Sequence, residues 1–437
     1  MKKTVKILCI LLVLGLAALL LTLTIGGRDI AAPDISDLMP EKQLIPEDQN
    51  AFGRLSAAAG AITLPSDFNI IVDYIEGKMI YDTLIAELLQ KNEQAFPLID
   101  QALALDQCQP PLLEEPAYIQ QWYQIAVLLG VQAVHSRHVG QLSQSVHATV
   151  SLLRFGDLLH PNTQNIADFS PSLKILQLGL NQAGDLARTE AISKDDLLLL
   201  AKALAALKPL APGLKRAFQF KFQKVAHQID GFRASGKNVE QAFPDTSLMI
   251  YFIRKTTWFP AYIFKENETK QKLAGLYRDT IHNASLNYAE MKIYDLTDYF
   301  GLQKQSMWYY YCRPNVVGRI FYAFTTPEID TYLEGKCQMD GSIRATQLIV
   351  ALKLFEKENG KLPSQLDELC PTYLSSVPID PFDGKPFRYN PAKGIVYSVS
   401  KDLKDSGGST EVPPEEIYGP DYPKTWIAED GVFRINP

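Results

Sequence analysis

The sequence predicts a mainly helical protein that begins with a transmembrane helix and ends with a small α+β module. Three observations predict this fold class. An uncharged apolar run occupies residues 7–25, apolar residues recur at helical spacing from about residue 68 to residue 335, and beyond residue 340 a helix precedes short segments separated by turn pairs. We therefore expect an irregular helical domain followed by a small antiparallel sheet packed on a helix.

The N-terminal run Ile7–Ile25 carries no charge and follows Lys2, Lys3 and Lys6. As a helix its nineteen residues span roughly 28 Å, close to the hydrocarbon thickness of a bilayer. The lysines before it and acidic residues such as Asp29 after it place the N-terminus in the cytoplasm. The pattern predicts a single-pass protein of the bacterial inner membrane. Residues 1–27 form its cytoplasmic tip and anchor, and its body is periplasmic or otherwise extracytoplasmic.

A cleaved signal peptide is the alternative interpretation of this run. Such a peptide has an apolar region of about 7 to 15 residues and a small-x-small cleavage site. The run here is longer, and Thr24-Ile25-Gly26 fits that site only in part, which favours a retained anchor. Both interpretations export the rest of the chain.

The composition argues against some classes of function. Of the 437 residues, 46% are hydrophobic and 21% are charged, which is typical of a packed globular protein rather than a disordered one. The formal net charge of −6 leaves no overall basic surface. The sequence therefore disfavours a nucleic-acid partner.

Cysteines in the exported part would meet an oxidising compartment, where disulfides persist. They are Cys108, Cys312, Cys337 and Cys370. Four cysteines allow three full pairings, and the sequence does not choose among them. Buried free thiols are the alternative.

Prolines and helical periodicity divide the exported part before residue 336. Residues 28–67 have prolines at positions 33, 40, 46 and 65 and are interpreted as an extracytoplasmic stalk. Residues 68–335 follow as the helical domain. Within it, Gly140 separates two amphipathic stretches, which predicts a helical hairpin, and Ser193 with Asp196 predicts a capped helix start.

Residues 336–437 are expected to form the α+β module. Its first helix is predicted to end at Asn359-Gly360, because glycine adopts the left-handed conformation that closes a helix. Ser364 with Asp367 predicts the start of a second, short helix. Turn pairs and alternating residues then predict strands at 387–389, 395–400 and 432–435.

This module carries a resemblance to a known family in the ordered segments ATQLIVALKLFEKENGKLPSQLDEL, VPIDPFDGKPFRYN and IVYSVSKDLKDSGG. Together they resemble the globular domain of the major pseudopilin of type II secretion, over residues 345–408 and the closing strand. The whole chain also resembles uncharacterised bacterial membrane-anchored proteins that carry this domain. The second resemblance implies no activity.

The pseudopilin resemblance implies a calcium site in the loop that follows the Tyr-Ser strand. The matching positions are the Val399 carbonyl and Asp402, with Asp405 as a nearby carboxylate. Calcium takes about six to eight oxygen ligands, so carbonyls, water or Glu411 would complete the set. Leu403 stands where the family has glycine, and a solvated acidic loop is the alternative interpretation.

The chain departs from a pseudopilin at its N-terminal end. The family's first helix contains a glutamate and runs directly into the globular domain. Ile7–Ile25 contains no acid, and a long helical region separates it from the module. Polymerisation as a pilin is therefore not expected, and the module is interpreted as a binding or capping domain.

Evidence for an enzyme is sparse in the sequence. His135 and His138 share a helix face and form a candidate zinc-ligand pair, but no carboxylate lies within a turn to complete a metal set. No nucleophile elbow, phosphate loop or dinucleotide fingerprint is found. Catalysis by residues from distant segments is not excluded, so whether the chain is an enzyme stays open, with a non-enzyme favoured.

We therefore expect a membrane-tethered, non-catalytic scaffold or binding protein of the cell envelope. Its partner would be a protein or a glycan, and its one implied cofactor is calcium. Two alternatives remain: an exported hydrolase with an unrecognised site in the helical domain, and an accessory component of a secretion system.

Overall fold

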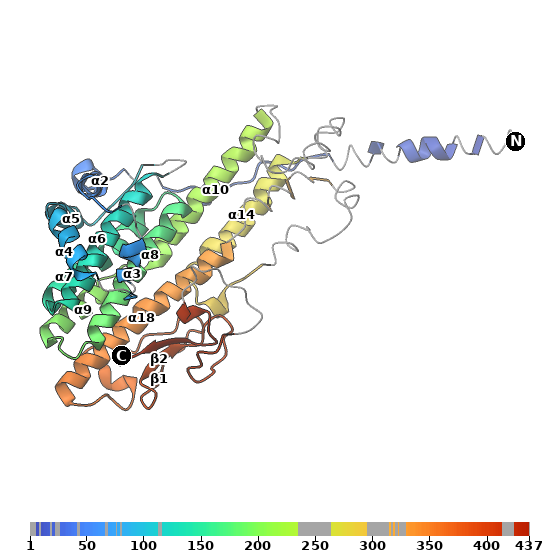
Figure 1. Cartoon of the computed structure of the whole chain (residues 1–437). Coiled ribbons are helices and arrows are strands. Elements are labelled where there is room, and N and C mark those ends of the chain that lie inside the picture. The colour runs from blue at the N-terminus through green and yellow to red at the C-terminus, as the bar shows by residue number, and fades with distance from the viewer. Residues whose placement is uncertain are drawn as a thin grey trace. The chain divides into compact units, whose positions relative to one another are not determined.

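The computed structural model describes residues 6–7, 10–17, 20–21, 27–41, 44–65, 69–75, 77–78, 81–111, 116–234, 264–294, 314–315, 318–319, 322, 329–412 and 424–436. Over these ranges the chain is mainly helical with one small antiparallel sheet, which confirms the expected mixture of elements (Figure 1). The chain forms two compact units. The first comprises residues 1–41, 219–281 and 292–329, and the second comprises 42–218, 282–291 and 330–437.

In the first unit, an extended segment follows the predicted anchor and is fixed to helix α14 (Glu266–Asn283). The carboxylate of Asp29 accepts hydrogen bonds from the backbone N–H groups of Asn267 and Glu268 at 2.8 and 3.0 Å, which caps the start of α14. Farther along, Arg278 donates to both carboxylate oxygens of Asp37 at 2.7 Å. The short helix η1 (Ser36–Leu38) lies in this segment, and its Leu38 is buried.

The predicted membrane anchor is described only in part. Ile10–Ala17 is helical and exposed, and several residues of Ile7–Ile25 lie outside the described ranges, so the anchor stays a prediction. One described stretch, Lys194–Gly231, is long and apolar enough to cross a membrane. It comprises helix α9 and most of α10, and Leu197 and Leu200 in it are fully buried. Of its apolar window 33% is buried inside the fold, and core helices of folded domains can share this composition.

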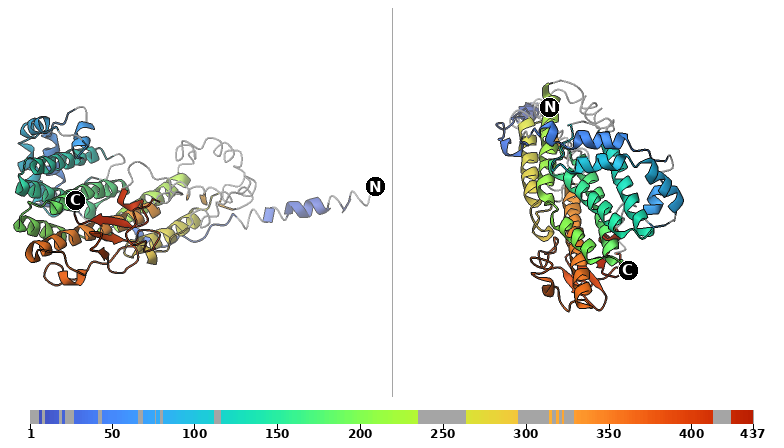
Figure 2. Two further views of the ribbon diagram at one scale, coloured as in Figure 1. Left: turned by 60° about the horizontal axis from the view of Figure 1, so that its bottom comes forward. Right: turned by 90° about the vertical axis from the view of Figure 1, so that its left-hand side faces the viewer.

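The second unit begins with short helices and continues with long antiparallel ones (Figures 1 and 2). After η2 (Glu47–Gln49), the helices are α2 (Phe52–Gly60), α3 (Asn69–Ile75), α4 (Asp82–Lys91), α5 (Ala95–Leu103), α6 (Tyr118–His138), α7 (Leu142–Leu159), η3 (His160–Asn162), α8 (Ile166–Arg188) and α9 (Lys194–Ala205). Helix α10 (Leu210–Ala234) begins in this unit and belongs to the first unit from residue 219 onward. The α6–α7 hairpin turns at Gly140, whose φ of +79° suits glycine, and this confirms the hairpin prediction.

Helix α2 changes the interpretation of the segment expected to be a stalk. It lies between the prolines at positions 46 and 65, and its Leu55, Ala58 and Ala59 are buried among residues of α5 and α6. Because burial of apolar side chains is the main stabilising contribution to a fold, residues 52–60 are part of the folded body. The proline pattern identified helix breaks correctly but did not show that a core helix lay between them.

Two glycines let helices α7 and α8 approach closely. A Cβ atom at Gly156 would lie 2.8 Å from the backbone of Leu176, and one at Gly179 would lie 3.0 Å from the Leu153 backbone nitrogen. The distance at Gly156 leaves no room for a Cβ, and a Cβ at Gly179 would require the Leu153 backbone to shift by a few tenths of an ångström. The two helices therefore pack backbone against backbone at this crossing.

The cap of α9 matches its prediction. The Ser193 hydroxyl accepts a hydrogen bond from the Asp196 backbone N–H at 3.0 Å. The helix ends at Ala205, shortly before Pro209, as the proline pattern indicates.

The C-terminal part contains helix α18 (Ile329–Asn359), η5 (Leu366–Leu369), η6 (Lys424–Trp426) and strands β1 (Arg388–Asn390), β2 (Ile395–Ser398) and β3 (Gly431–Arg434). The strands form an antiparallel sheet in the order β1-β2-β3, with Tyr389 opposite Val396 and Val396 opposite Phe433. The sheet lies beside α18 (Figures 1 and 2). The three predicted strands are confirmed, with small differences at their ends.

Trp426 connects the sheet to α18. Its ring lies 5.4 Å from Phe382 and 5.7 Å from Phe433, centre to centre, and its indole N–H donates to the Ser342 hydroxyl on α18 at 3.3 Å. A Cβ at Gly341 would lie 2.6 Å from the same ring, so the small residue on the helix accommodates it. The segment around η4 (Tyr288–Glu290) joins this cluster, because Tyr288 donates its N–H to the Pro381 carbonyl.

The helix ends of this part refine the sequence prediction. α18 ends at Asn359 and Gly360 adopts φ +71°, as expected. The short helix is instead capped one residue later, by Gln365 with Glu368 in a reciprocal capping box. α18 runs without a break through residues 335 and 336, and its Gln347 donates to the Leu204 carbonyl of α9 at 3.0 Å. The domain boundaries expected from the sequence stay predictions.

Candidate functional site

The predicted calcium loop has a definite backbone conformation. Leu403 adopts φ +59° and Ser400 adopts φ +54°, both in the left-handed region. At the position of Leu403, the pseudopilin family that the sequence resembles has glycine, which adopts this conformation easily. The Asp402 carboxylate accepts the Lys404 N–H at 2.9 Å. The departure at Leu403 therefore coexists with a left-handed loop, at the steric cost that a side chain brings to this region.

Two further acids, Asp405 and Asp430, accept hydrogen bonds from backbone N–H groups of this loop. Asp405 accepts hydrogen bonds from the Gly407 N–H at 3.0 Å and from the Tyr397 hydroxyl at 3.1 Å. Asp430, which is buried, accepts the N–H of Gly408 at 2.8 Å. Burial raises the pKa of Asp430 against the effect of its backbone hydrogen bonds. The sequence did not single out Asp430, which lies far along the chain from the loop.

The carboxylate of Asp405 also lies near the positively charged side chain of Arg388. Arg388 Nε lies 3.7 Å from Asp405 Oδ2, and Val399, the third predicted ligand residue, is buried with its N–H donated to Asp380. Over the described ranges, no group of three or more His, Cys, Asp and Glu side chains has an arrangement that would hold a metal ion. Carbonyl ligands contribute to calcium sites as well, so the calcium site stays a prediction.

The carboxylate of Asp380 connects several segments of the C-terminal module by hydrogen bonds. This buried carboxylate accepts four hydrogen bonds, from Phe382 N, Ser398 Oγ, Val399 N and Arg388 Nη1, at 2.8 to 3.0 Å. Burial raises its pKa, whereas the hydrogen bonds and the Arg388 charge lower it. The same arginine holds Asp383. Burial raises the pKa of Asp383, but the hydrogen bonds from Arg388 and the Lys385 N–H, together with the charges of both residues, leave it lowered overall. This network joins the turn at 380–384 to β1 and β2.

The predicted histidine pair acquires a carboxylate from another helix. His135 Nδ1 and His138 Nδ1 lie 3.8 and 3.6 Å from Oδ1 of Asp82, the first residue of α4. The buried Tyr74 hydroxyl donates to the same oxygen at 2.8 Å and lies 3.2 Å from His135 Nδ1. Burial, followed by the hydrogen bond to Asp82, raises the pKa of Tyr74. The sequence offered no signal for Asp82, since the approach of α4 to α6 is a tertiary contact.

The cysteines described are free thiols. Cys108 and Cys337 are buried and Cys370 is partly exposed, whereas Cys312 lies outside the described residues. Burial raises the pKa of Cys108 and raises that of Cys337 to about 12. Thiolates are the reactive form, so these two buried thiols are inert at neutral pH.

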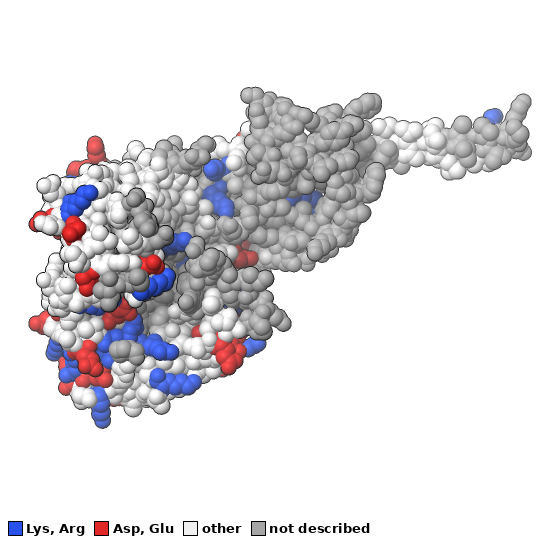
Figure 3. All heavy atoms as spheres, viewed as in Figure 1, with Lys and Arg blue, Asp and Glu red and all other residues white. Residues whose placement is uncertain are grey.

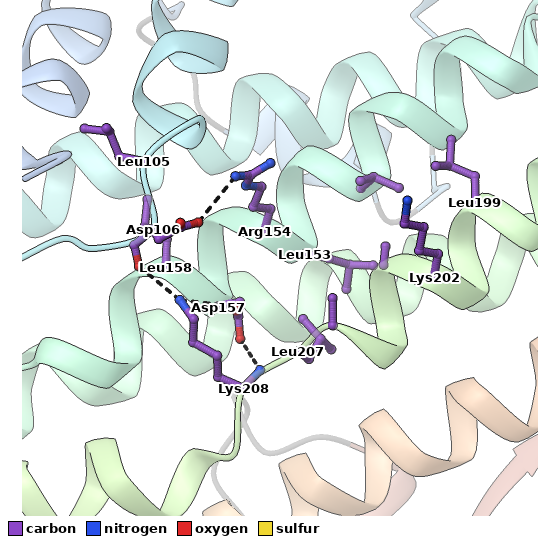
Figure 4. A pocket seen from close by; sticks show the side chains of 13 residues that line it. Leu105, Asp106, Leu153, Arg154, Asp157, Leu158, Leu199, Lys202, Leu207 and Lys208 are labelled. Atoms are coloured by element: carbon purple, nitrogen blue, oxygen red, sulfur yellow. Dashed lines mark hydrogen bonds and ion pairs between the residues drawn. The ribbon is translucent and has the colours of Figure 1, made fainter. Parts of the chain in front are cut away.

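A pocket that the sequence did not predict opens between α7, α9 and the loop after α5, and we call it the α7–α9 pocket (Figure 4). Its volume is about 350 Å³. Most of its wall is aliphatic, and we call these residues the apolar floor: Leu105, Val150, Leu153, Leu158, Leu199, Ala203, Ala206 and Leu207. This volume lies in the range of small-molecule binding sites.

Charged side chains from all three elements lie around this floor: Arg154 and Asp157 of α7, Lys202 of α9, and Asp106 and Lys208 of the adjoining loops. Asp157 is mostly buried, and its carboxylate accepts the backbone N–H of Lys208 at 2.6 Å. It also lies 3.7 Å from Lys208 Nζ and 3.4 Å from the buried His160 Nε2. Asp157 therefore fixes the chain where α9 ends.

The two other cations are less constrained. Arg154 lies 3.7 Å from Asp106, whose side chain is 89% exposed, so solvent weakens that ion pair. The Lys202 side chain is exposed and makes no hydrogen bond or ion pair with any described residue. The pocket lining thus carries three cations against two carboxylates, and one carboxylate already has a structural role.

Comparison with known proteins gives no relative from which a site could be transferred. No protein-family model, curated protein or solved structure matches the chain. The resemblance of the C-terminal module to the pseudopilin domain therefore stays a prediction. The function has to be inferred from the contacts of this chain's own residues.

Proposed function

We propose that the chain is a membrane-tethered protein of the bacterial envelope that works by binding a ligand rather than by catalysis. The tether is Ile7–Ile25, and the lysines before it keep the N-terminus in the cytoplasm. The ligand site is the α7–α9 pocket, and the C-terminal module serves as a second surface for a protein or glycan partner.

The chemistry of the α7–α9 pocket carries this proposal. Its lining consists only of leucine, valine, alanine, arginine, lysine and aspartate. Among the described residues that line it there is no hydroxyl, thiol or imidazole that would act as a nucleophile or as a histidine base, and its buried acid, Asp157, accepts a hydrogen bond that fixes the backbone at Lys208. An apolar cavity with a few charged groups at its edge is suited to holding a molecule and not to transforming it.

The C-terminal module supports a role in recognition because its polar groups are used internally. Asp380, Arg388 and Asp383 form a closed network, and Trp426 fixes the sheet on α18. A surface on such a scaffold is held rigid, which reduces the entropy lost when a partner binds. On the face shown in Figure 3, acidic and basic side chains are interspersed, which is suited to a partner of mixed charge.

Native mass spectrometry of the full chain tests the ligand site. We expect the purified chain to carry a non-covalent small molecule that Ala203→Trp, which fills the pocket, displaces. Lys174→Gln is the matched control, because Lys174 is exposed on α8, outside the pocket, and makes no polar contact with a described residue. Identical spectra for the wild type and Ala203→Trp would contradict the proposal.

The tether is tested separately in intact cells. A C-terminal tag should be degraded by protease added once the outer membrane is permeable, while the inner membrane is still sealed. A tag that stays protected would place the body in the cytoplasm and contradict the envelope proposal.

A further inference from the structure

We infer that the ligand of the α7–α9 pocket is an anionic amphiphile, a single acyl chain that ends in a carboxylate. This inference rests on the proposed function and names the chemical class of the ligand. Two properties of the pocket lead to it: the apolar floor is continuous across two helices, and the charges around it are unbalanced.

The apolar floor supplies the site for the chain. Leu153 and Leu158 come from α7, and Leu199, Ala203 and Leu207 come from α9 and the turn after it. The aliphatic hollow of about 350 Å³ opens to solvent, so its apolar side chains are left partly in contact with water. Filling it with methylene groups would remove this apolar surface from water, which favours binding.

Lys202 and Arg154 supply the site for the head group. Lys208 is already bound, since its Nζ donates to the Asp106 carbonyl at 3.1 Å and lies near Asp157. Lys202 has no partner among the described residues, and Arg154 has only a solvent-exposed one. An anion at the edge of the pocket would therefore pair with Lys202 and replace Asp106 beside Arg154 (Figure 4).

The same contacts disfavour other small ligands. A cationic amphiphile would meet Lys202 and Arg154 with like charge, and a short anion without a chain would leave the apolar floor exposed to water. A neutral hydrocarbon would fill the floor without using either cation. Each of these alternatives predicts a different response to charge substitution.

Equilibrium binding of radiolabelled decanoate to the full chain in phosphatidylcholine nanodiscs tests the inference. The signal from Ala203→Trp nanodiscs is subtracted to remove decanoate held by the bilayer. We expect saturable binding that Lys202→Gln weakens about threefold to tenfold and that Lys174→Gln leaves unchanged. Acetate and decyltrimethylammonium at equal concentration should not compete. Thermal melts of each variant establish that it is folded.

The possible outcomes separate this inference from the proposed function. Equal affinities of Lys202→Gln and Lys174→Gln, or equal competition by decyltrimethylammonium, would overturn the anionic ligand. If Ala203→Trp still displaced a molecule in the native spectra, the binding function would stand. The absence of any ligand in those spectra, together with no decanoate binding, would overturn both. Should Ala203→Trp fail to fold, the two lysine variants still decide the question of charge.

Discussion

The C-terminal module and the α7–α9 pocket use their charged side chains in opposite ways. In the module, Asp380 accepts four hydrogen bonds and Arg388 pairs with three carboxylates, so the charges stabilise the fold. In the pocket, Lys202 has no described partner and Arg154 has a weak one. The comparison teaches that satisfied charges mark a scaffold and that surplus charges beside an apolar hollow mark a binding site.

The strongest test of this comparison removes the centre of the module's network. Asp380→Ala would leave Arg388 and buried donors without their acceptor, so we expect a loss of about 3–5 kcal/mol in the free energy of unfolding. Urea denaturation measures it. Asp402→Asn in the exposed loop is the control and should change stability by no more than about 0.5 kcal/mol. Equal effects of the two substitutions would remove Asp380 from its organising role.

The next largest effect is a pH dependence of the free energy of unfolding, and it comes from the buried acid Asp168 of the helical body. Tyr118 donates to Asp168 Oδ1 at 2.8 Å, while Asp168 Oδ2 is buried without a hydrogen-bond partner in the described structure. Burial raises the pKa of Asp168 to about 6, so the folded state binds this proton more tightly than the unfolded state. Stability should therefore fall by about 2–3 kcal/mol as pH rises from about 4 to about 7.

Asp168→Asn tests that dependence, because an amide does not titrate in this range. The difference in unfolding free energy between wild type and variant, measured by urea denaturation at several pH values, should change mainly between pH 4 and pH 6. A constant difference across that interval would show that Asp168 titrates normally.

The next smaller effect on stability comes from close helix packing, and it should differ between a buried glycine and an exposed one. Gly156→Ala would place a methyl group 2.8 Å from the Leu176 backbone, so we expect a loss of about 1–3 kcal/mol. Gly53→Ala, at an exposed position of α2, has no atom within 4 Å of the new Cβ, and there we expect a gain of about 0.5–1 kcal/mol. Thermal melts of both variants measure the difference. A stabilising Gly156→Ala would contradict the close crossing of α7 and α8.

The smallest expected effect concerns calcium at the loop containing Asp402 and Asp405. Sites in extracellular modules have dissociation constants of about 0.1–1 mM, so 1 mM calcium would add roughly 0.4–1.4 kcal/mol to stability. Melts with calcium and with chelator measure the shift, and Asp402→Asn should abolish it. If the wild type melts at the same temperature with calcium and with chelator, the charges of this loop act only in hydrogen bonds within the fold.

Local signals predicted much of the architecture. Ser193 capped α9, Gly140 turned the hairpin and Gly360 closed α18, because caps and left-handed positions depend on a few neighbouring residues. The short helix at 366–369 shifted its cap from Ser364 to Gln365, since two adjacent polar residues compete for the same N–H groups.

The candidate sites were harder to predict because they combine distant segments. Asp82 reaches the histidine pair from another helix, and the α7–α9 pocket requires α7, α9 and the loop after α5 together. Periodicity describes one face of one helix and carries no information on which face it meets. For the same reason the proline-rich segment concealed α2, whose burial depends on its contacts with α5 and α6.

The attachment of residues 29–37 to α14 has a mechanical consequence. Asp29 holds the first turn of that helix and Asp37 holds Arg278, about three turns farther along. A pull on the chain ahead of Asp29 would load these contacts along the helix axis, in shear, and they would share the force. If residues 7–25 are held in a membrane, as proposed, thermal motion of that membrane would reach α14 as tension and not as slack in a loose linker.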